Sequence, residues 1–260
     1  PQYHFNITPG ELHYDMFGCL TETLVADPVE VLTTMANWEF VESTYAKQWQ
    51  QREEKARQGH TDYLKGLTWS DLQVFDHLMH SLPADSDLQL ANSTPVRYAQ
   101  LFAPRPDIRY FSNRGVSGID GTLSTAVGAA LHTDRIVTVV TGDLGFFYDS
   151  NALWHNHWPD NLRIILINNG GGNIFRYIPG PDTTEALETY FEGHHNFDAA
   201  HLAKAVGLDY MAVGDLVSLQ AGLTALYANQ DAIQLLEIKT PGPENALLLR
   251  QYFEHLKAYR

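Results

Sequence analysis

Two short runs of aliphatic and β-branched residues constrain the fold of this chain more than any other feature. Residues 135–141 read RIVTVVT, and residues 162–167 read LRIILI. Runs of this kind, without alternating polar residues, are typical of strands that are buried on both faces of a parallel sheet. Parallel neighbours need long crossover connections, usually helices. The two runs therefore predict an α/β fold.

The pattern around these runs supports that fold class, because strands and helices alternate from residue 70 onward. Ser70 and Gln73 predict a capping box that starts a helix reaching about residue 81. Further strands are predicted at 87–91, 108–111, 208–213 and 232–239, and further helices at 95–102, 119–132, 198–206, 216–228 and 244–258. Such alternation predicts a doubly wound, mostly parallel sheet with helices on both faces.

The beginning of the chain has a different composition. Tyr3–Ile7 and Thr21–Val25 resemble short strands, and Asp27 followed by Pro28 predicts the start of a helix. A polar stretch rich in Glu, Gln, Lys and Arg follows and predicts an exposed helix. We therefore predict that residues 1–34 are the end of a middle domain, 35–68 a helical linker, and 69–260 the α/β domain. The first residue is Pro1, which suggests a piece of a longer protein.

Charge and cysteine content narrow the possible partners and location. The net charge is −14, which disfavours nucleic acid and anionic lipid as partners. Cys19 is the only cysteine, so no disulfide can form within the chain, as suits a reducing cytosol. No apolar run reaches the ~18 residues that a membrane span needs. We expect a cytoplasmic location.

Two motifs at strand ends carry the chemistry. Gly142-Asp143-Leu144 follows the first run, and Asn168 to Asn173 (NNGGGN) follows the second. Parallel strands end at the same edge of the sheet, where open α/β folds bind ligands. A carboxylate, an amide and a carbonyl there are hard oxygen ligands suited to Mg²⁺, and glycines allow close approach to phosphates. Alternatively, Asp143 caps a helix and the glycines form a flexible loop, but the pairing of both motifs makes that interpretation weaker.

The two motifs together resemble the thiamine-diphosphate signature, in which Gly-Asp-Gly precedes Asn-Asn by some 25–30 residues. The resemblance implies that Asp143, Asn169 and the carbonyl of Gly171 bind Mg²⁺ (or Mn²⁺), which in turn holds the diphosphate of the cofactor. Leu144 replaces the third glycine of the wider family. The Gly-Asp-Leu variant is usual in the synthases that make 2-succinyl-5-enolpyruvyl-6-hydroxy-3-cyclohexene-1-carboxylate for menaquinone biosynthesis, here called SEPHCHC synthases.

Other segments narrow the resemblance to the SEPHCHC synthases. They are residues 112–121 (SNRGVSGIDG), 148–153 (YDSNAL), 173–175 (NIF) and 91–93 (ANS) with Arg97. The similarity covers most of residues 86–200. It implies an enzyme that decarboxylates 2-oxoglutarate and adds the resulting succinyl semialdehyde carbanion to isochorismate.

The resemblance also implies roles for individual residues. Substrate-binding residues are expected to be Asn92, Ser93, Arg97, Arg114 and Phe175. Cofactor-binding residues are expected to be Ser117, Gly118, Ile119, Gly142, Asp143, Leu144, Asn169, Gly171, Asn173 and Ile174. Both substrates are dianions, and arginine binds carboxylates bidentately, which agrees with the roles given to Arg97 and Arg114.

Simpler interpretations exist for single residues. Either arginine could form a surface ion pair, and Ile119 and Phe175 could be ordinary core. His155 and His157 fall on a predicted helix, and His194 and His195 in a polar loop. We interpret all four as solvated or locally bonded, although the loop at 190–196 could cover the site. We interpret 185–192 as a solvated face.

The resemblance also implies something that this chain lacks. Thiamine enzymes use a glutamate at the aminopyrimidine of the cofactor, and in this family it lies in an N-terminal domain with no counterpart before residue 86. We therefore expect the chain alone to bind diphosphate weakly and not to turn over, and the full-length protein to be a homodimer or homotetramer.

Two other functions stay open. One is another thiamine-diphosphate enzyme, such as a 2-oxo acid decarboxylase or an acetolactate synthase, which the segment at 112–121 disfavours. The other is a non-catalytic module that binds Mg²⁺ or a nucleotide. No Gly-x-Gly-x-x-Gly follows a strand and no Walker lysine motif occurs, so the usual nucleotide-binding patterns are missing.

Overall fold

The structure, a computed structural model, describes all residues except 1, 11–12, 40–41, 156, 229–232 and 260. The chain forms two compact units, Pro1–Gln51 and Arg52–Arg260. The division between them falls within one helix, α2 (Tyr45–Leu64). The domain boundaries expected at residues 34 and 68 stay predictions.

The first unit contains two parallel strands and a helix. β1 (His4–Thr8) pairs with β2 (Leu20–Val25), and α1 (Pro28–Ala36) follows. The helix begins as the sequence predicts, because the Asp27 carboxylate accepts a hydrogen bond from the backbone N–H of Val29 at 2.7 Å. No residue of α1 is buried within the described part of the chain.

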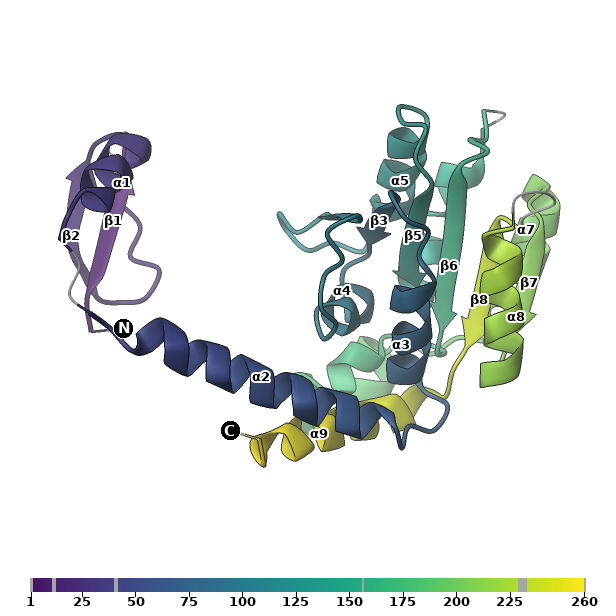
Figure 1. The fold of residues 1–260 in the computed structure, drawn as a ribbon. Helices are drawn as coiled ribbons and strands as arrows, with labels where there is room; N and C mark the ends of the chain where they lie inside the picture. Colours follow the sequence, from purple (N-terminus) through teal and green to yellow (C-terminus); the bar gives the residue numbers. More distant parts are fainter. Residues whose placement is uncertain (1, 11–12, 40–41, 156, 229–232, 260) are drawn as a thin grey trace. The chain divides into compact units, whose positions relative to one another are not determined.

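The second unit is built on a six-stranded sheet in which every pairing is parallel (Figure 1). Its order is β4-β3-β5-β6-β8-β7. The strands are β3 (Asp87–Leu90), β4 (Arg109–Ser112), β5 (Val137–Gly142), β6 (Leu162–Asn168), β7 (Tyr210–Val213) and β8 (Leu235–Lys239). The predicted doubly wound α/β fold is confirmed.

The helices of this unit are α3 (Asp71–Ser81), α4 (Thr94–Ala99), α5 (Thr122–Ala130), α6 (Asp143–Tyr148), α7 (Ala199–Val206), α8 (Leu216–Leu226) and α9 (Gly242–Lys257). Short helical turns occur at η1 (Ser150–Leu153), η2 (Asn173–Arg176), η3 (Pro181–Thr183) and η4 (Leu187–Phe191). No described helix is long and apolar enough to cross a membrane.

Two hydrophobic clusters cover the two faces of the sheet. One contains side chains of α3, α4, α8 and α9 together with Ile165 and Ile167 of β6. The other contains side chains of α5, α6 and α7 together with Ile164 and Leu166 of the same strand. Alternate residues of β6 thus enter opposite clusters, as expected for a strand buried on both faces.

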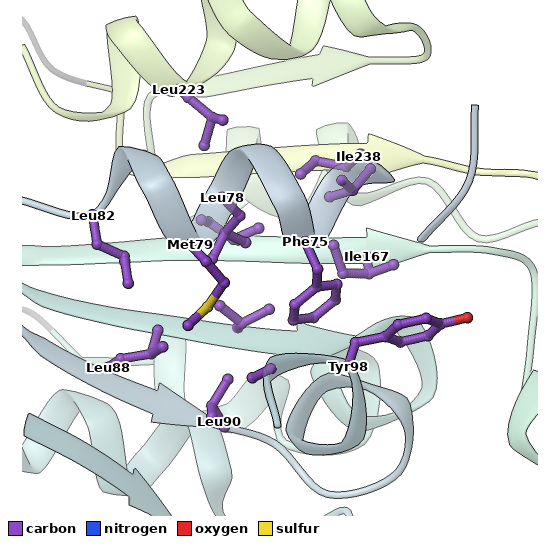
Figure 2. Close-up of a cluster of buried hydrophobic side chains, with 14 of the residues drawn as sticks. Phe75, Leu78, Met79, Leu82, Leu88, Leu90, Tyr98, Ile167, Leu223 and Ile238 are labelled. Atoms are coloured by element: carbon purple, nitrogen blue, oxygen red, sulfur yellow. The ribbon is translucent and has the colours of Figure 1, made fainter. Parts of the chain in front are cut away.

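The first cluster fixes α3 on the sheet (Figure 2). Phe75, Leu78 and Met79 of α3 are buried in one cluster with Ile167 of β6 and with Leu88 and Leu90 of β3. Tyr98 of α4 stacks on Phe75 with ring centroids 5.4 Å apart. The first turn of α3 is thereby held at a fixed place relative to β6, which bears on the site below.

Several local predictions need correction. The helix predicted at 119–132 begins only at Thr122, because Gly121 has a left-handed φ of 76° that a right-handed helix does not admit. Ile119 therefore lies in the preceding loop. Ser70 caps α3, but the Gln73 side chain donates to the carbonyl of Leu67 instead of completing a capping box.

Two histidines also differ from expectation. His155 and His157 follow η1 and lie outside the helices of the described residues. The ring of His155 stacks on Trp158 at a centroid separation of 5.9 Å. The ring thus makes a local contact, as expected, although the secondary structure is different.

Candidate active site

A cavity of about 270 Å³ lies where β3, β5 and β6 end. These three strands are neighbours in the sheet. The chain passes from β3 outward to β4 and then returns to place β5 on the other side of β3, so the strand order reverses between β3 and β5. Open α/β sheets bind ligands beyond the carboxyl ends of the strands at such a reversal.

The cavity brings together every site residue named from the sequence except Gly118. Its lining includes Asn92, Ser93, Arg97, Arg114, Ser117, Ile119, Gly142, Asp143, Leu144, Asn169, Gly171, Asn173, Ile174 and Phe175. Gly118 is linked to it indirectly, because its carbonyl accepts a hydrogen bond from Asn92 Nδ2 at 2.5 Å. Ala91, Thr94, Thr141, Gly145, Gly172 and Ile178 also line the cavity, although they were not among the predicted site residues.

Two lining serines have unusual backbone conformations. Ser93 has a φ of 75° and Ser117 a φ of 57°, and Asp85 is the only other described non-glycine residue with positive φ. Residues other than glycine adopt such values at a free-energy cost and mostly where function requires them. Both serines lie in segments quoted for the family resemblance, so the strain coincides with the site.

Asp143 is the buried carboxylate of the site. Its Oδ2 accepts hydrogen bonds from the backbone N–H groups of Gly170 at 2.8 Å and Gly171 at 2.9 Å. Its Oδ1 accepts from the N–H of Leu144 at 2.7 Å. The end of β5 is thereby joined directly to the loop that follows β6, as the paired motifs predict.

The loop after β6 presents several oxygens to the cavity. Asn173 Nδ2 donates to Asn169 Oδ1 at 2.8 Å, and the N–H of Asn173 donates to the Gly171 carbonyl at 2.9 Å. An amide or carbonyl oxygen has two lone pairs, so both acceptors can bind one further partner.

One atom of this loop lacks a partner. Asn173 Oδ1 is buried and receives no hydrogen bond from the described residues. Leaving a buried acceptor unpaired is unfavourable by roughly 1–3 kcal/mol. This orphaned oxygen, beside the carboxylate, amide and carbonyl oxygens, fits a bound polar ligand or hydrated cation.

The donor set of the described residues is that of a hard cation. In the part of the chain that the structure describes, no three His, Cys, Asp or Glu side chains gather in a way that could hold a metal ion. A site built from one carboxylate, one amide and one carbonyl suits instead a hard cation that retains water and phosphate oxygens as ligands. The residues present therefore fit Mg²⁺ together with a diphosphate.

The two predicted arginines lie at the rim of the cavity with exposed side chains. Arg114 Nη1 donates to Asn92 Oδ1 at 2.7 Å, and Arg97 Nη1 donates to the carbonyl of Ser93 at 2.7 Å. Neither forms an ion pair with a described residue. The simpler interpretation as surface ion pairs is thus not supported, and both positive charges remain available for an anionic ligand.

A buried aspartate behind the site was missed in the sequence. Asp71 accepts hydrogen bonds from Asn169 Nδ2 at 3.0 Å and from the Thr240 hydroxyl at 2.6 Å. Burial raises the pKa of Asp71 to about 6, although these hydrogen bonds act in the opposite direction. The sequence around Asp71 indicates only the start of a helix. It does not indicate the contact with Asn169, because the two residues are 98 positions apart.

The segment after η4 also differs from expectation. Glu192, expected on a solvated face, is fully buried and ion-paired with Arg176. Its backbone carbonyl accepts from the N–H of Gly172 at 2.6 Å. The chain folds back on the glycine loop here, and this removes Glu192 from solvent.

The two neighbouring histidines lie in different environments. His195 has a side chain only 5% exposed, and its Nε2 lies 3.4 Å from Asp143 Oδ2. His194 is more exposed and lies 2.8 Å from a carboxylate oxygen of Glu192. Both make local contacts, as one of the two interpretations of the sequence predicted: His195 Nδ1 accepts a hydrogen bond from the N–H of Phe197 at 3.1 Å, and its ring lies beside the Asp143 carboxylate.

Comparison with known proteins identifies the family of this fold. The family model "Thiamine pyrophosphate enzyme, C-terminal TPP binding domain" matches residues 93–238. This range includes the cavity-lining motifs at the ends of β5 and β6. The resemblance to the thiamine-diphosphate signature is thus confirmed at the level of the domain.

Curated relatives agree with the narrower resemblance. Proteins named 2-succinyl-5-enolpyruvyl-6-hydroxy-3-cyclohexene-1-carboxylate synthase from Flavobacterium johnsoniae and Flavobacterium psychrophilum are 42% and 41% identical to it, each over 98% of this chain and 46% of the relative. The protein of that name from Porphyromonas gingivalis is 41% identical over 82% of this chain and 37% of the relative. The chain thus spans about half the length of the first two relatives.

Proposed function

Because this chain belongs to the thiamine pyrophosphate enzymes, by its match to their C-terminal TPP binding domain, we propose that it forms the cofactor-binding part of a SEPHCHC synthase. The reaction proposed for the whole protein is decarboxylation of 2-oxoglutarate and transfer of the succinyl semialdehyde unit to isochorismate, in menaquinone biosynthesis. The observation that carries the proposal is the convergence of the metal motif with Arg97 and Arg114 around one cavity.

We assign the metal ligands to Asp143, the amide oxygen of Asn169 and the carbonyl of Gly171, which would hold Mg²⁺ or Mn²⁺. The unsatisfied Asn173 Oδ1 and the spare lone pairs beside it support this assignment. When bound, thiamine diphosphate supplies the electron sink for the decarboxylation. The strand ends provide fixed oxygens that need little rearrangement when the diphosphate arrives.

The remaining lining residues are assigned by their place and chemistry. The cofactor would contact Ser117, Gly118, Ile119, Gly142, Leu144, Asn173 and Ile174, whereas substrate would contact Asn92, Ser93, Arg97, Arg114 and Phe175. Arg97 and Arg114 would bind substrate carboxylates, because guanidinium groups keep their charge and match the carboxylate fork. Phe175 would exclude water from the reacting carbon.

The test is product formation by the full-length gene product. Purified protein is incubated with thiamine diphosphate, Mg²⁺, 2-oxoglutarate and isochorismate, and the expected product is followed by mass spectrometry. Omission of either substrate should abolish the product. Turnover of pyruvate to acetolactate, without any product from isochorismate, would instead favour a different thiamine-diphosphate enzyme.

A further inference from the structure

Asn168 is the last residue of β6 and Asn169 follows it, and each of their side chains donates to a buried carboxyl group. Asn168 Nδ2 donates to Glu237 Oε1 at 2.6 Å, and Asn169 Nδ2 donates to Asp71 Oδ2 at 3.0 Å. Glu237 is 0% exposed and Asp71 is 1% exposed. Two carboxyl groups are therefore buried next to one dipeptide, which is unfavourable unless their hydrogen bonds compensate.

The burial of Asp71 is not explained by a cation among the residues that the structure describes. No described Lys, Arg or His side chain forms an ion pair with it. Its carboxylate oxygens accept hydrogen bonds from neutral groups, the Thr240 hydroxyl and the Asn169 amide. Asn245 Oδ1 accepts from the backbone N–H of Asp71 at 2.8 Å and fixes the same turn of α3.

The contact with the Asp71 carboxylate restricts how the Asn169 amide can turn. An asparagine side chain has an NH₂ donor on one side and an oxygen acceptor on the other, and the two orientations are nearly equal in shape. An ionised carboxylate only accepts hydrogen bonds, so it binds the NH₂ side alone. The amide oxygen must then lie on the other side, where Asn173 Nδ2 bonds it at 2.8 Å and where both residues line the cavity.

We propose that Asp71 is a positioning residue that holds the Asn169 amide in the one orientation in which its oxygen can bind the metal. The inference rests on the proposed metal site and goes beyond it, because Asp71 lies outside the cavity lining and belongs to a helix not matched by the family model. α3 is fixed on the sheet by Phe75 and Leu78, so the first turn of that helix supplies a rigid support for the ligand.

Glu237 offers a matched control. It is a buried carboxylate that binds the neighbouring amide, but Asn168 does not line the cavity. Its second oxygen accepts from the Tyr210 hydroxyl. Removing either carboxylate takes one acceptor from an amide of the same dipeptide, yet only loss of Asp71 releases a proposed metal ligand.

The experiment measures Mn²⁺ affinity in the presence of thiamine diphosphate, by electron paramagnetic resonance of free Mn²⁺, in the full-length gene product. Asp71→Leu should weaken Mn²⁺ binding roughly 10- to 100-fold, as is typical when a residue that orients a metal ligand is lost. Glu237→Met should lower the unfolding temperature but change Mn²⁺ affinity by less than about threefold. Asp71→Asn keeps the shape and one acceptor oxygen, so it should recover part of the affinity lost in Asp71→Leu.

A further variant distinguishes the positioning role of Asp71 from the proposed metal site. Asn169→Ala tests the metal ligand itself and should lose Mn²⁺ affinity to at least the extent of Asp71→Leu. If Asn169→Ala is impaired while Asp71→Leu and Asp71→Asn both bind Mn²⁺ like the wild type, the positioning role is wrong and the metal site stands. If the wild type binds no Mn²⁺, both ideas fail. Should Asp71→Leu not fold, the comparison of Asp71→Asn with Glu237→Gln decides, since equal affinities in these two would also overturn the role.

Discussion

At the scale of single residues, the glycine loop after β6 leaves no room for a side chain at Gly171. Gly171 has a φ of 146°, and a Cβ added there would lie 2.6 Å from the backbone carbonyl oxygen of Glu192. Because that atom belongs to the main chain, it cannot turn away as the end of a flexible side chain could. The close approach of the segment after η4 to the loop therefore depends on glycine at this position.

Gly171→Ala should destabilise the protein and weaken metal binding together. The strained backbone should lower the free energy of unfolding by roughly 1–3 kcal/mol. The overlap with Glu192 should lower it by roughly another 1–3 kcal/mol. Gly180→Ala is the control, because Gly180 also has a left-handed φ, of 114°, but open space around its Cβ. The free energy of unfolding, measured with denaturant, should be lower for Gly171→Ala than for Gly180→Ala. Equal losses of unfolding free energy would show that the chain moves to relieve the overlap.

Arg97 and Arg114 permit a second test at this scale. In the full-length gene product, Arg114→Ala or Arg97→Ala should lower kcat/KM roughly tenfold or more if each arginine binds a substrate carboxylate. Lysine should restore only part of the activity, because it lacks the bidentate fork. Affinity for thiamine diphosphate should stay close to that of the wild type. Near-normal kcat/KM for both substrates in Arg114→Ala would remove that residue from the site, and Arg97 needs the same measurement.

At the scale of elements, the end of α2 packs on α9 through a half-buried histidine. His60 Nδ1 lies 2.9 Å from the Tyr252 hydroxyl, and its ring meets those of Tyr252 and Phe102 edge to face. Burial lowers the pKa of His60, partly opposed by the charge of Asp76. The neutral ring is thus favoured in the folded protein.

This pKa shift predicts a pH dependence of stability. The unfolded chain protonates His60 near its ordinary pKa of about 6.5, whereas the folded chain does so only at lower pH. The stabilisation is complete above pH 6.5 and is lost as the pH falls through the folded pKa. His60→Gln should reduce the loss of unfolding free energy between pH 7 and 5, measured by urea unfolding. An equal loss of unfolding free energy in His60→Gln and in the wild type would contradict this assignment.

The order of elements was largely predictable from the sequence, because strand and helix periodicities are local. The cavity was predictable from Asp143 and Asn169, because each follows a strand whose neighbour could be inferred. Asp71, Glu192 and His195 could not be placed in the same way. Their contacts depend on the path of loops and on pairs far apart in sequence, which no local pattern encodes.

At the scale of the whole chain, every residue of the cavity lies in the unit Arg52–Arg260. Binding of Mg²⁺ and thiamine diphosphate should therefore slow amide hydrogen exchange in β5, β6 and residues 169–173 of the full-length gene product. A ligand at 100 times its Kd stabilises by about 2.7 kcal/mol. β1 and β2 of the other unit provide an internal reference, and samples with chelator show the metal requirement. Protection spread evenly over both units would contradict a local site.

The all-parallel sheet has a consequence for how the protein is made. Asp71 is synthesised 169 residues before Thr240, whose hydroxyl bonds its carboxylate. At 5–20 residues per second, translation leaves the aspartate without that partner for roughly 10–30 s. β8, which flanks β6, also emerges late. The nascent chain therefore presents α3 and the early strands with exposed apolar faces until β8 and Thr240 have been synthesised, and a chaperone that protects such surfaces would act during that interval.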